Sequence, residues 1–256
     1  MPERRPPYCT LSSIYDRWQR SYGMEYNHSI LPRLRQTFRR YGVTPSHLLE
    51  IGCGTGTMAL LLSREGWNVV GIDPAEGMIA EARAKAGADS ARIRFLPGDV
   101  RTLPLKREFQ AAISLYDVFN HLASLDDVVA VLRAIHAALV PAGLLVFDVN
   151  NARGYRKLWR RDDTIREREF IMTIANSFDA RAGCAISRVG VTFSDGRPGI
   201  EETITQKLFV KKELQAALMT TGFRVLESVD FAFPSAPGAG KLKTWWVAQT
   251  AGQPER

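Results

Sequence analysis

The stretch from residue 48 to residue 74, LLEIGCGTGTMALLLSREGWNVVGIDP, constrains the fold of this chain more than any other. A short apolar run leads into closely spaced glycines, where the backbone turns tightly and can approach a ligand without interference from Cβ atoms. A helical pattern follows from Met58 to Leu62, and a second apolar run ends at Asp73. This order predicts one strand–helix–strand unit of a doubly wound sheet, with a ligand site at the carboxyl ends of its strands.

The glycines of this loop follow the pattern G-x-G-x-G: Gly52, Gly54 and Gly56. A dinucleotide fingerprint, G-x-G-x-x-G, would need its third glycine at the position of Thr57. With Glu50 two residues before the first glycine, the loop resembles motif I of the class I S-adenosylmethionine-dependent methyltransferases. The resemblance implies that Glu50 and the glycines shape a site for S-adenosyl-L-methionine, whose ammonium and sulfonium suit a carboxylate. Asp73 would accept hydrogen bonds from the ribose hydroxyls of this cofactor.

Two other interpretations fit the same stretch. One is an α/β core whose glycine turn binds no ligand, and the other is the nicotinamide site of a reductase. The glycine spacing, both flanking strands and the terminal acid coincide here, which favours a nucleoside cofactor over an empty turn. Thr57 stands where a third glycine would be, so a nicotinamide-dependent reductase is the less favoured alternative.

The composition is that of an ordinary globular protein. A chain of 256 residues with 45% hydrophobic content can bury one core and carry a small accessory subdomain. No apolar run approaches the roughly 20 residues of a membrane span, and the first ten residues lack the apolar centre of a signal peptide. We therefore expect a cytoplasmic protein without a membrane partner. Its three cysteines have no metal or disulfide spacing, which predicts reduced thiols and no metal site.

The net charge of +7 raises the question of a nucleic-acid partner. Much of the excess precedes the glycine loop: Arg4, Arg5, Arg17, Arg20, Arg33, Arg35, Arg39 and Arg40. A basic patch on RNA is one interpretation, and a solvated helix face is the other. We favour the solvated face because no RNA-binding module accompanies the charge. An RNA methyltransferase stays open as an alternative.

The first 44 residues predict a helical cap. Residues 1–9 contain three prolines and are expected to be disordered, whereas residues 12–42 show helical spacing of apolar residues in two segments. In methyltransferases of similar layout, such a segment folds over the cofactor and lends aromatic residues to the active site. The resemblance implies this use for Tyr15 and Tyr26, with packing within the cap as the alternative.

Two further segments resemble the same family. Met78 lies in the helix after Asp73, at a position that in this family is often near the adenine. The run IRFLPGDV predicts a third strand that ends near Asp99 and Val100. By the resemblance, the carboxylate of Asp99 binds the exocyclic amine of adenine and the amide of Val100 reaches a ring nitrogen.

The segment LYDVFNHL follows a fourth predicted strand and should reach the carboxyl edge of the sheet beside the donor methyl. It resembles the corresponding segment of small-molecule N-methyltransferases, some of which act on amino sugars. Leu115, Tyr116 and Asp117 would border the reacting methyl. His121 is placed to act as a general base or to orient the substrate, or else to cap the next helix. Tyr15 would close the pocket from above.

The chain predicts an α/β fold: a Rossmann-like, doubly wound, mostly parallel seven-stranded sheet with an antiparallel β-rich insertion. We expect the helical cap at residues 1–44, the methyltransferase domain at residues 45–151 and 211–256, and the insertion at residues 152–210. The insertion is expected to form a lid beside the active site, although its apolar residues would also suit the contact surface of a homodimer. The predicted function is transfer of a methyl group to a nitrogen or oxygen of a small-molecule substrate.

Overall fold

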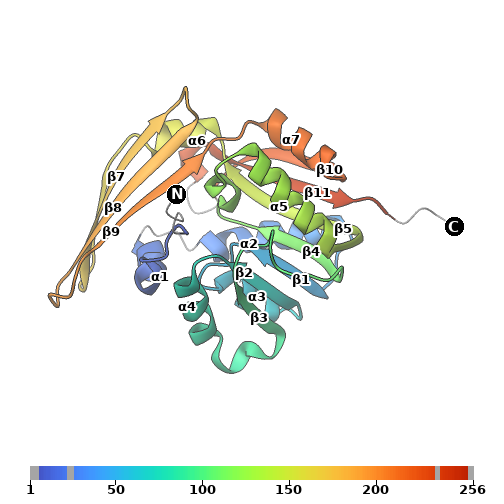
Figure 1. The fold of residues 1–256 in the computed structure, drawn as a ribbon, viewed down its shortest axis with the longest axis horizontal. Coiled ribbons are helices and arrows are strands. Elements are labelled where there is room, and N and C mark those ends of the chain that lie inside the picture. The colour runs from blue at the N-terminus through green and yellow to red at the C-terminus, as the bar shows by residue number, and fades with distance from the viewer. Residues whose placement is uncertain (1–5, 22–25, 234–236, 253–256) are drawn as a thin grey trace.

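The computed structural model describes residues 6–21, 26–233 and 237–252, which build two sheets (Figure 1). The larger sheet has seven strands in the order β10-β11-β5-β4-β1-β2-β3. Its strands are β1 (His47–Ile51), β2 (Asn68–Asp73), β3 (Ile93–Pro97), β4 (Phe109–Ser114), β5 (Leu139–Asn150), β10 (Phe223–Ala232) and β11 (Lys241–Thr250). β1 to β5 pair in parallel, whereas β11 is antiparallel to both of its neighbours. This arrangement confirms the predicted Rossmann-like sheet.

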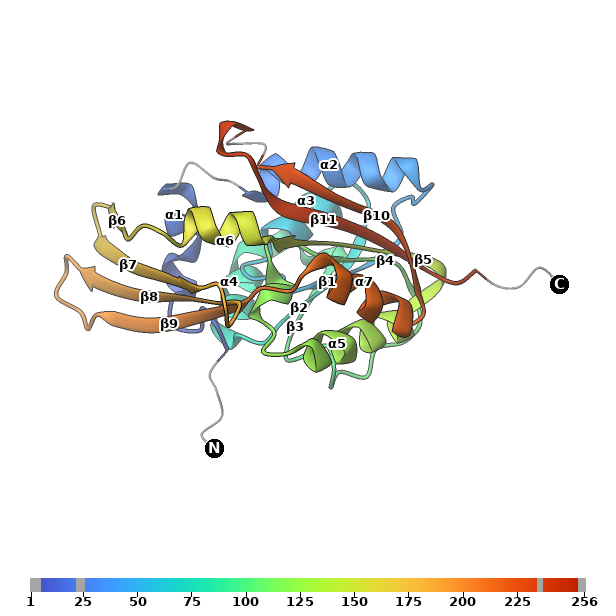
Figure 2. The same ribbon diagram turned by 90° about the horizontal axis from the view of Figure 1, so that it is seen from above.

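Helices cover both faces of this sheet (Figure 2). They are α2 (Tyr26–Arg40), α3 (Thr57–Ser63), α4 (Glu76–Ala86), α5 (Leu125–Ala138) and α7 (Lys211–Thr220). α2, α3 and α4 contribute to one apolar layer, and α5 and α7 to the other. Trp245 and Trp246 are adjacent in β11 and fully buried in opposite layers, because successive side chains of a strand point to opposite faces.

The smaller, antiparallel sheet has the order β6-β7-β8-β9 and lies beside the carboxyl edge of the larger one (Figure 1). We call it the lid sheet: β6 (Asp163–Arg166), β7 (Phe170–Asp179), β8 (Cys184–Phe193) and β9 (Ile200–Lys207). It confirms the predicted antiparallel insertion. Its inner face packs on α1 (Ser12–Ser21), where Ile14 and Trp18 meet Met172 and Ile174 in a third apolar cluster. The division into cap, methyltransferase domain and lid at the expected boundaries stays a prediction.

Two elements differ from the expectation. Residues 7–11 form a turn, although disorder was expected up to residue 9, and the amides of Tyr8 and Thr10 donate to the carboxylate of Glu202 in β9. Residues 1–5 lie outside the described residues. The second element is the helix α6 (Ala152–Leu158), which the sequence analysis placed inside the β-rich insertion. In the described ranges, no helix is both long and apolar enough to cross a membrane.

The position of α6 depends on a close backbone contact. The side chain of Asn151 caps the helix by accepting a hydrogen bond of 2.9 Å from the amide of Gly154. A Cβ atom on Gly154 would lie 2.3 Å from the carbonyl oxygen of Leu242 in β11. Only glycine therefore lets α6 lie this close to the strand.

We expect Gly154→Ala to lower the free energy of unfolding by about 1–3 kcal/mol, because the backbone of α6 or β11 must move to make room. Urea denaturation measures the change. Gly238→Ala is the control, because nothing lies within 4 Å of the position of its Cβ. Equal effects of the two substitutions would contradict the close-packing explanation.

Candidate active site

A cavity of about 1240 Å³ runs along the carboxyl edge of the parallel strands. The loops after β1, β2, β3 and β4 line it, and so do Asn150 at the end of β5, α1 and the lid sheet. The carboxyl edge of a doubly wound sheet is where its ligands bind, because the connections separate there. This cavity is therefore the candidate active site.

The glycine loop at one end of the cavity is fixed by Asp73. One carboxylate oxygen of Asp73 accepts a hydrogen bond of 2.9 Å from the amide of Gly54, and the other accepts one of 2.9 Å from the amide of Ala75. Gly52 and Gly54 have φ angles of +70° and +52°, in the left-handed region that favours glycine. A Cβ on Gly52 would also lie 2.4 Å from a methyl of Val118, so this position has no room for a side chain.

The carboxyl group of Glu50 lines the same end of the cavity and is almost fully buried. Burial, and next the nearby charge of Asp73, raise the pKa of Glu50 to about 8. Among the described residues, its Oε2 atom has no hydrogen-bond partner. A buried carboxyl group without a cationic partner from the chain fits a ligand that brings its own positive charge.

Beyond Asp73, the wall of the cavity is formed by Met78, Asp99 and Val100. Arg101 donates to both carboxylate oxygens of Asp99, with distances from 2.6 to 3.0 Å, and also to Asp127 at 2.5 Å. Burial acts to raise the pKa of Asp99, but the hydrogen bonds from Arg101 outweigh it and hold the pKa below its ordinary value. Asp99 is thus an anionic hydrogen-bond acceptor in this wall.

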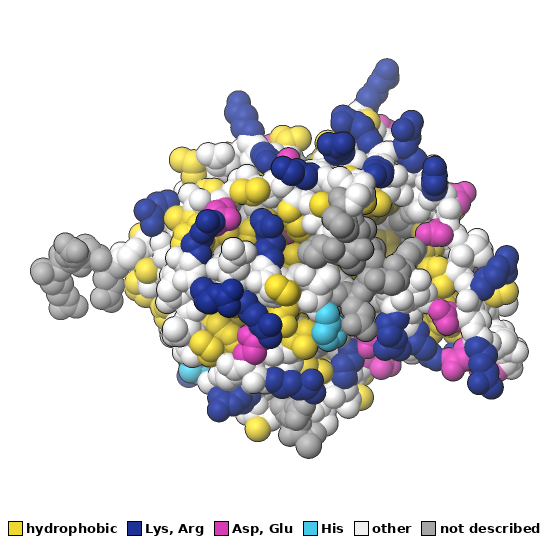
Figure 3. Space-filling model, turned by 180° about the vertical axis from the view of Figure 1, so that it is seen from behind, with side chains coloured by type: hydrophobic (Ala, Val, Ile, Leu, Met, Phe, Trp, Pro, Cys, Tyr) yellow, Lys and Arg dark blue, Asp and Glu magenta, His cyan; other side chains and the backbone are white. Residues whose placement is uncertain are grey.

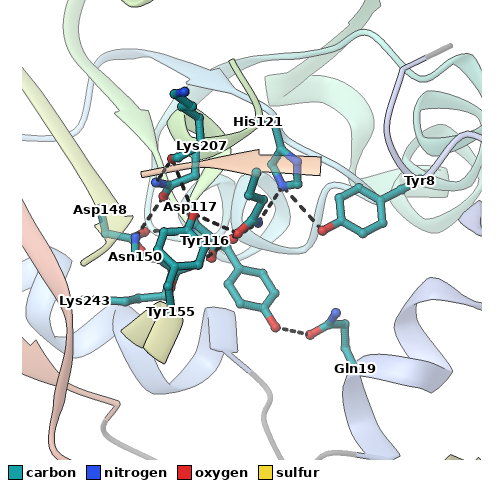
Figure 4. A network of polar contacts seen from close by, with 12 residues as sticks. Tyr8, Gln19, Tyr116, Asp117, His121, Asp148, Asn150, Tyr155, Lys207 and Lys243 are labelled. Atoms are coloured by element: carbon teal, nitrogen blue, oxygen red, sulfur yellow. Dashed lines mark hydrogen bonds and ion pairs between the residues drawn. The ribbon is translucent and has the colours of Figure 1, made fainter. Parts of the chain in front are cut away.

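At the other end of the cavity, Lys243 is buried between two carboxylates (Figure 4). Its ammonium donates to Asp148 at 2.6 Å and to Asp117. Burial alone would lower the pKa of Lys243, but the two carboxylates raise it, so the side chain stays charged. Asp148 also accepts a hydrogen bond of 2.6 Å from the amide of Tyr116. These bonds hold Tyr116 and Asp117 in the left-handed region, at φ +67° and +56°, where residues other than glycine are strained.

Asp117 is connected through Gln206 of β9 to His121. The amide nitrogen of Gln206 lies 2.5 Å from Asp117 and 3.1 Å from Nε2 of His121. Its amide oxygen accepts hydrogen bonds from Tyr155 at 3.1 Å and from Asn150 at 3.2 Å. Because both of those groups are donors, the nitrogen of Gln206 must face Asp117 and His121. Nε2 of His121 lies within hydrogen-bond distance of this nitrogen and 3.4 Å from the hydroxyl of Tyr8.

Aromatic rings from the N-terminal turn and α1 enclose this histidine. The ring of Tyr8 lies 5.3 Å from that of His121 and 5.5 Å from that of Tyr15, and its hydroxyl is 3.4 Å from Nε2. α1 is in turn tied to the glycine loop, since Asp16 accepts a hydrogen bond of 2.6 Å from Thr55 and pairs with Lys85 at 2.5 Å. α1 and the lid sheet therefore both form walls of the cavity.

Most of the predicted site residues line this cavity: Tyr15, Glu50, Gly52, Gly54, Asp73, Met78, Asp99, Val100, Leu115, Tyr116, Asp117 and His121. Gly56 and Tyr26 do not belong to the lining. A Cβ on Gly56 would lie 2.5 Å from the ring of Phe95, so this glycine serves packing. Tyr26 is buried behind Tyr116, with the two rings stacked at 4.4 Å.

Several residues of the polar network were not expected from the sequence, among them Tyr8, Gln206 and Lys243. Lys243 carried a signal, since a lysine within the apolar run LKTWWVA is unusual for a buried strand. Tyr8 lies in a proline-rich segment, and Gln206 is one of many polar residues in the insertion. Among the described residues, no three His, Cys, Asp or Glu side chains are grouped to hold a metal ion.

Comparisons with known proteins agree with this geometry. Residues 48–143 match the family described as a methyltransferase domain. A methyltransferase-family protein of Geobacillus sp. (strain WCH70) is 32% identical over 240 residues, covering 92% of each chain. The chain belongs to the S-adenosylmethionine-dependent methyltransferases. S-adenosylmethionine is therefore its cofactor, and the residues beside the glycine loop fit it, since Oε2 of the buried Glu50 has no hydrogen-bond partner among the described residues and Glu50 lines the cavity.

Two other relatives extend the comparison of this methyltransferase. A Streptomyces venezuelae protein named dTDP-3-amino-3,4,6-trideoxy-alpha-D-glucopyranose N,N-dimethyltransferase is 27% identical over 190 residues, which are 70% of this chain and 76% of the relative. The crystal structure of an S-adenosylmethionine-dependent methyltransferase from Clostridium acetobutylicum superposes with a TM-score of 0.77 at 17% identity. The match covers 96% of this chain and 99% of that one. The second likeness shows the shared fold.

We expect the stability of the ligand-free methyltransferase to fall as the pH rises from 5 to 8. The folded protein keeps a proton on Glu50 up to a pKa of about 8, whereas the unfolded chain releases it near 4.5. Since the folded state binds more protons in this window, the free energy of unfolding falls by about 3 kcal/mol across it. Urea denaturation at several pH values measures the slope.

Glu50→Gln should remove this part of the pH dependence, because a glutamine does not titrate. Glu76→Gln, at an exposed position in the first turn of α4, is the matched control and should keep the slope of the wild type. The same slope in Glu50→Gln as in the wild type would show that Glu50 is ionised in the folded protein.

Proposed function

We propose that this methyltransferase transfers the methyl group of S-adenosylmethionine to a nitrogen or oxygen of a small-molecule acceptor. The observation that carries the proposal is the position of His121, whose Nε2 lies 3.1 Å from the amide nitrogen of Gln206 in the cavity beside α1 and the lid sheet. A histidine held in this way is placed to accept a proton from a small nucleophile that must lose one.

The end of the cavity at the glycine loop, which we call the donor end, holds the cofactor in this proposal. The carboxyl group of Glu50 pairs with a cationic group, Asp73 accepts from the ribose, and Asp99 accepts from the adenine amine. When bound, S-adenosylmethionine supplies an electrophilic methyl carbon on a sulfonium. The donor-end residues orient this group so that its methyl faces the segment from Leu115 to His121, because a fixed near-attack geometry accounts for much of the rate of a displacement.

His121 takes the proton from the acceptor at its Nε2 atom, and the contact of this atom with the amide of Gln206 is released in that step. The chain of contacts from Lys243 through Asp117 and Gln206 fixes the position of the ring before the acceptor binds. Tyr8 covers the ring of His121, and Tyr15 packs on Tyr8. The acceptor nitrogen or oxygen replaces the hydroxyl of Tyr8 beside Nε2 and is positioned against the methyl.

An amine acceptor receives additional support from the Streptomyces venezuelae relative, whose name describes an amino-sugar N,N-dimethyltransferase. The alternative of an RNA methyltransferase is less favoured, because no RNA-binding module accompanies the basic charge in the sequence. Because the chain belongs to the methyltransferase family, we no longer propose that it is a nicotinamide-dependent reductase. The cytoplasmic location and a homodimer contact stay predictions from the sequence.

We expect S-adenosylhomocysteine at 100 times its Kd to raise the melting temperature by about 5–10 °C, since ligand binding to the folded state adds about 2.7 kcal/mol. Asp73→Ala should abolish this rise, because it removes both the ribose acceptor and the acceptor for the amide of Gly54. Differential scanning fluorimetry measures both. Asp126→Ala, in the first turn of α5, is the control. A wild-type rise in Asp73→Ala would place the nucleoside elsewhere.

We expect His121→Ala to lower turnover by about 10²–10³-fold while the affinity for S-adenosylhomocysteine changes less than about twofold, because only the proton acceptor is lost. Formation of S-adenosylhomocysteine with a metabolite extract of low molecular mass measures turnover. His47→Ala, at the exposed start of β1, is the control.

Two results would contradict this proposal. If His121→Ala turns over as fast as the wild type, His121 is not the general base. Product formation with bulk RNA but not with the metabolite extract would replace the small-molecule acceptor by RNA.

A further inference from the structure

The two ends of the cavity differ in their charged side chains. At the donor end, which holds the glycine loop, the carboxyl groups of Glu50, Asp73 and Asp99 line the cavity together with Arg101, which pairs with Asp99. The end that follows β5 is lined by five basic side chains from α6 and the residues after it, which we call the basic rim: Arg153, Arg156, Lys157, Arg160 and Arg161. Asp163 is the acidic side chain that lines the cavity next to them.

This separation follows from the sheet topology. The donor end lies at β1, β2 and β3, whereas α6 directly follows β5, two strands away from β1 on the opposite side. The basic rim is therefore at the end where the acceptor must lie if the donor occupies the acidic end. A space-filling view of the back of the molecule shows Lys and Arg side chains gathered densely at the top, towards the lid sheet (Figure 3).

The chain itself does not neutralise the basic rim. Within the described residues, none of its four arginines pairs with a carboxylate, and Lys157 donates to the carbonyl of Ala239 at 2.5 Å. The nearest acids in sequence use their carboxylates for backbone amides: Asp162 accepts from Asn176, and Asp163 from Thr164. Four arginines are thus free to bind an anion.

The rim is held in place by the polar network that positions His121. Tyr155 of α6 is fully buried, and its hydroxyl donates to Gln206 at 3.1 Å. The next turn is fixed by Trp159, whose indole nitrogen donates to Ser187 of β8 at 3.0 Å and whose ring lies 4.8 Å from that of Tyr155. One side of α6 is therefore anchored, and its charged residues are left exposed at the cavity.

We propose that the basic rim binds a phosphate or diphosphate group of the acceptor, whose reacting nitrogen or oxygen reaches His121. This inference rests on the proposed function and names the class of its substrate. Arginine suits phosphate because its planar guanidinium donates two parallel hydrogen bonds to the oxygens. A single carboxylate would leave most of the five cations without a partner, whereas a diphosphate can contact several at once.

Calorimetric titration of inorganic pyrophosphate into the protein loaded with S-adenosylhomocysteine tests the proposal. We expect binding that weakens with added NaCl and that falls at least about 30-fold in the double variant Arg156→Ala/Arg160→Ala, since two charge-assisted contacts are lost. The charge-matched control is Lys106→Ala/Arg133→Ala, at exposed positions outside the cavity, and should change the affinity less than about twofold.

The affinity for S-adenosylhomocysteine separates this inference from the proposed function. Failure of S-adenosylhomocysteine to bind would contradict the proposed function. If S-adenosylhomocysteine binds but both double variants have the same affinity for pyrophosphate, only the proposal that the basic rim binds phosphate is wrong. If malonate binds as tightly as pyrophosphate and depends equally on Arg156 and Arg160, the basic rim binds a carboxylate of the acceptor rather than a phosphate. A single-stranded RNA oligonucleotide that displaces pyrophosphate would overturn the small-molecule assignment.

Discussion

The buried ion pairs of Lys243 are the interaction on which the active site depends. A lysine in the core is tolerated only with partners, and here the two carboxylates come from Asp117, in the loop after β4, and Asp148, within β5. Removing one partner would leave a buried charge unpaired. The two ion pairs therefore fix the positions of Lys243, Asp117 and Asp148 relative to one another. Through Asp117 this constraint fixes Gln206 of the lid sheet and then His121. The larger sheet thus sets the geometry of the lid.

Both ends of the cavity have ionisable side chains without a partner of opposite charge among the described residues. At the donor end, Glu50 is buried without a cation from the described chain, and its raised pKa records that cost. At the acceptor end, the arginines of the basic rim have no carboxylate partners among the described residues. A cationic donor and an anionic acceptor would each supply the charge that its end lacks. This charge pattern is the basis for the orientation that we propose for both substrates along one cavity.

The sequence predicted the elements whose chemistry is local. The glycine loop and Asp73 lie within one strand–helix–strand unit, so spacing alone indicated their place in the fold. Three features depended on contacts between distant segments and escaped prediction. Tyr8 is ordered by Glu202, which lies 194 residues away, and Gln206 gains its role only when β9 packs beside His121. The helix α6 is stabilised by its cap at Asn151 and by packing on β11, and the contact with the distant β11 is not visible in the sequence of α6 alone.

A crystal structure of the methyltransferase with S-adenosylhomocysteine tests the central claim most directly, because it shows which end of the cavity holds the donor. We expect electron density in which the ribose of the ligand lies at Asp73, its amino acid group at Glu50 and its sulfur on the side of Tyr116 and His121. Density with the nucleoside at the basic rim, or with the sulfur turned away from His121, would contradict it.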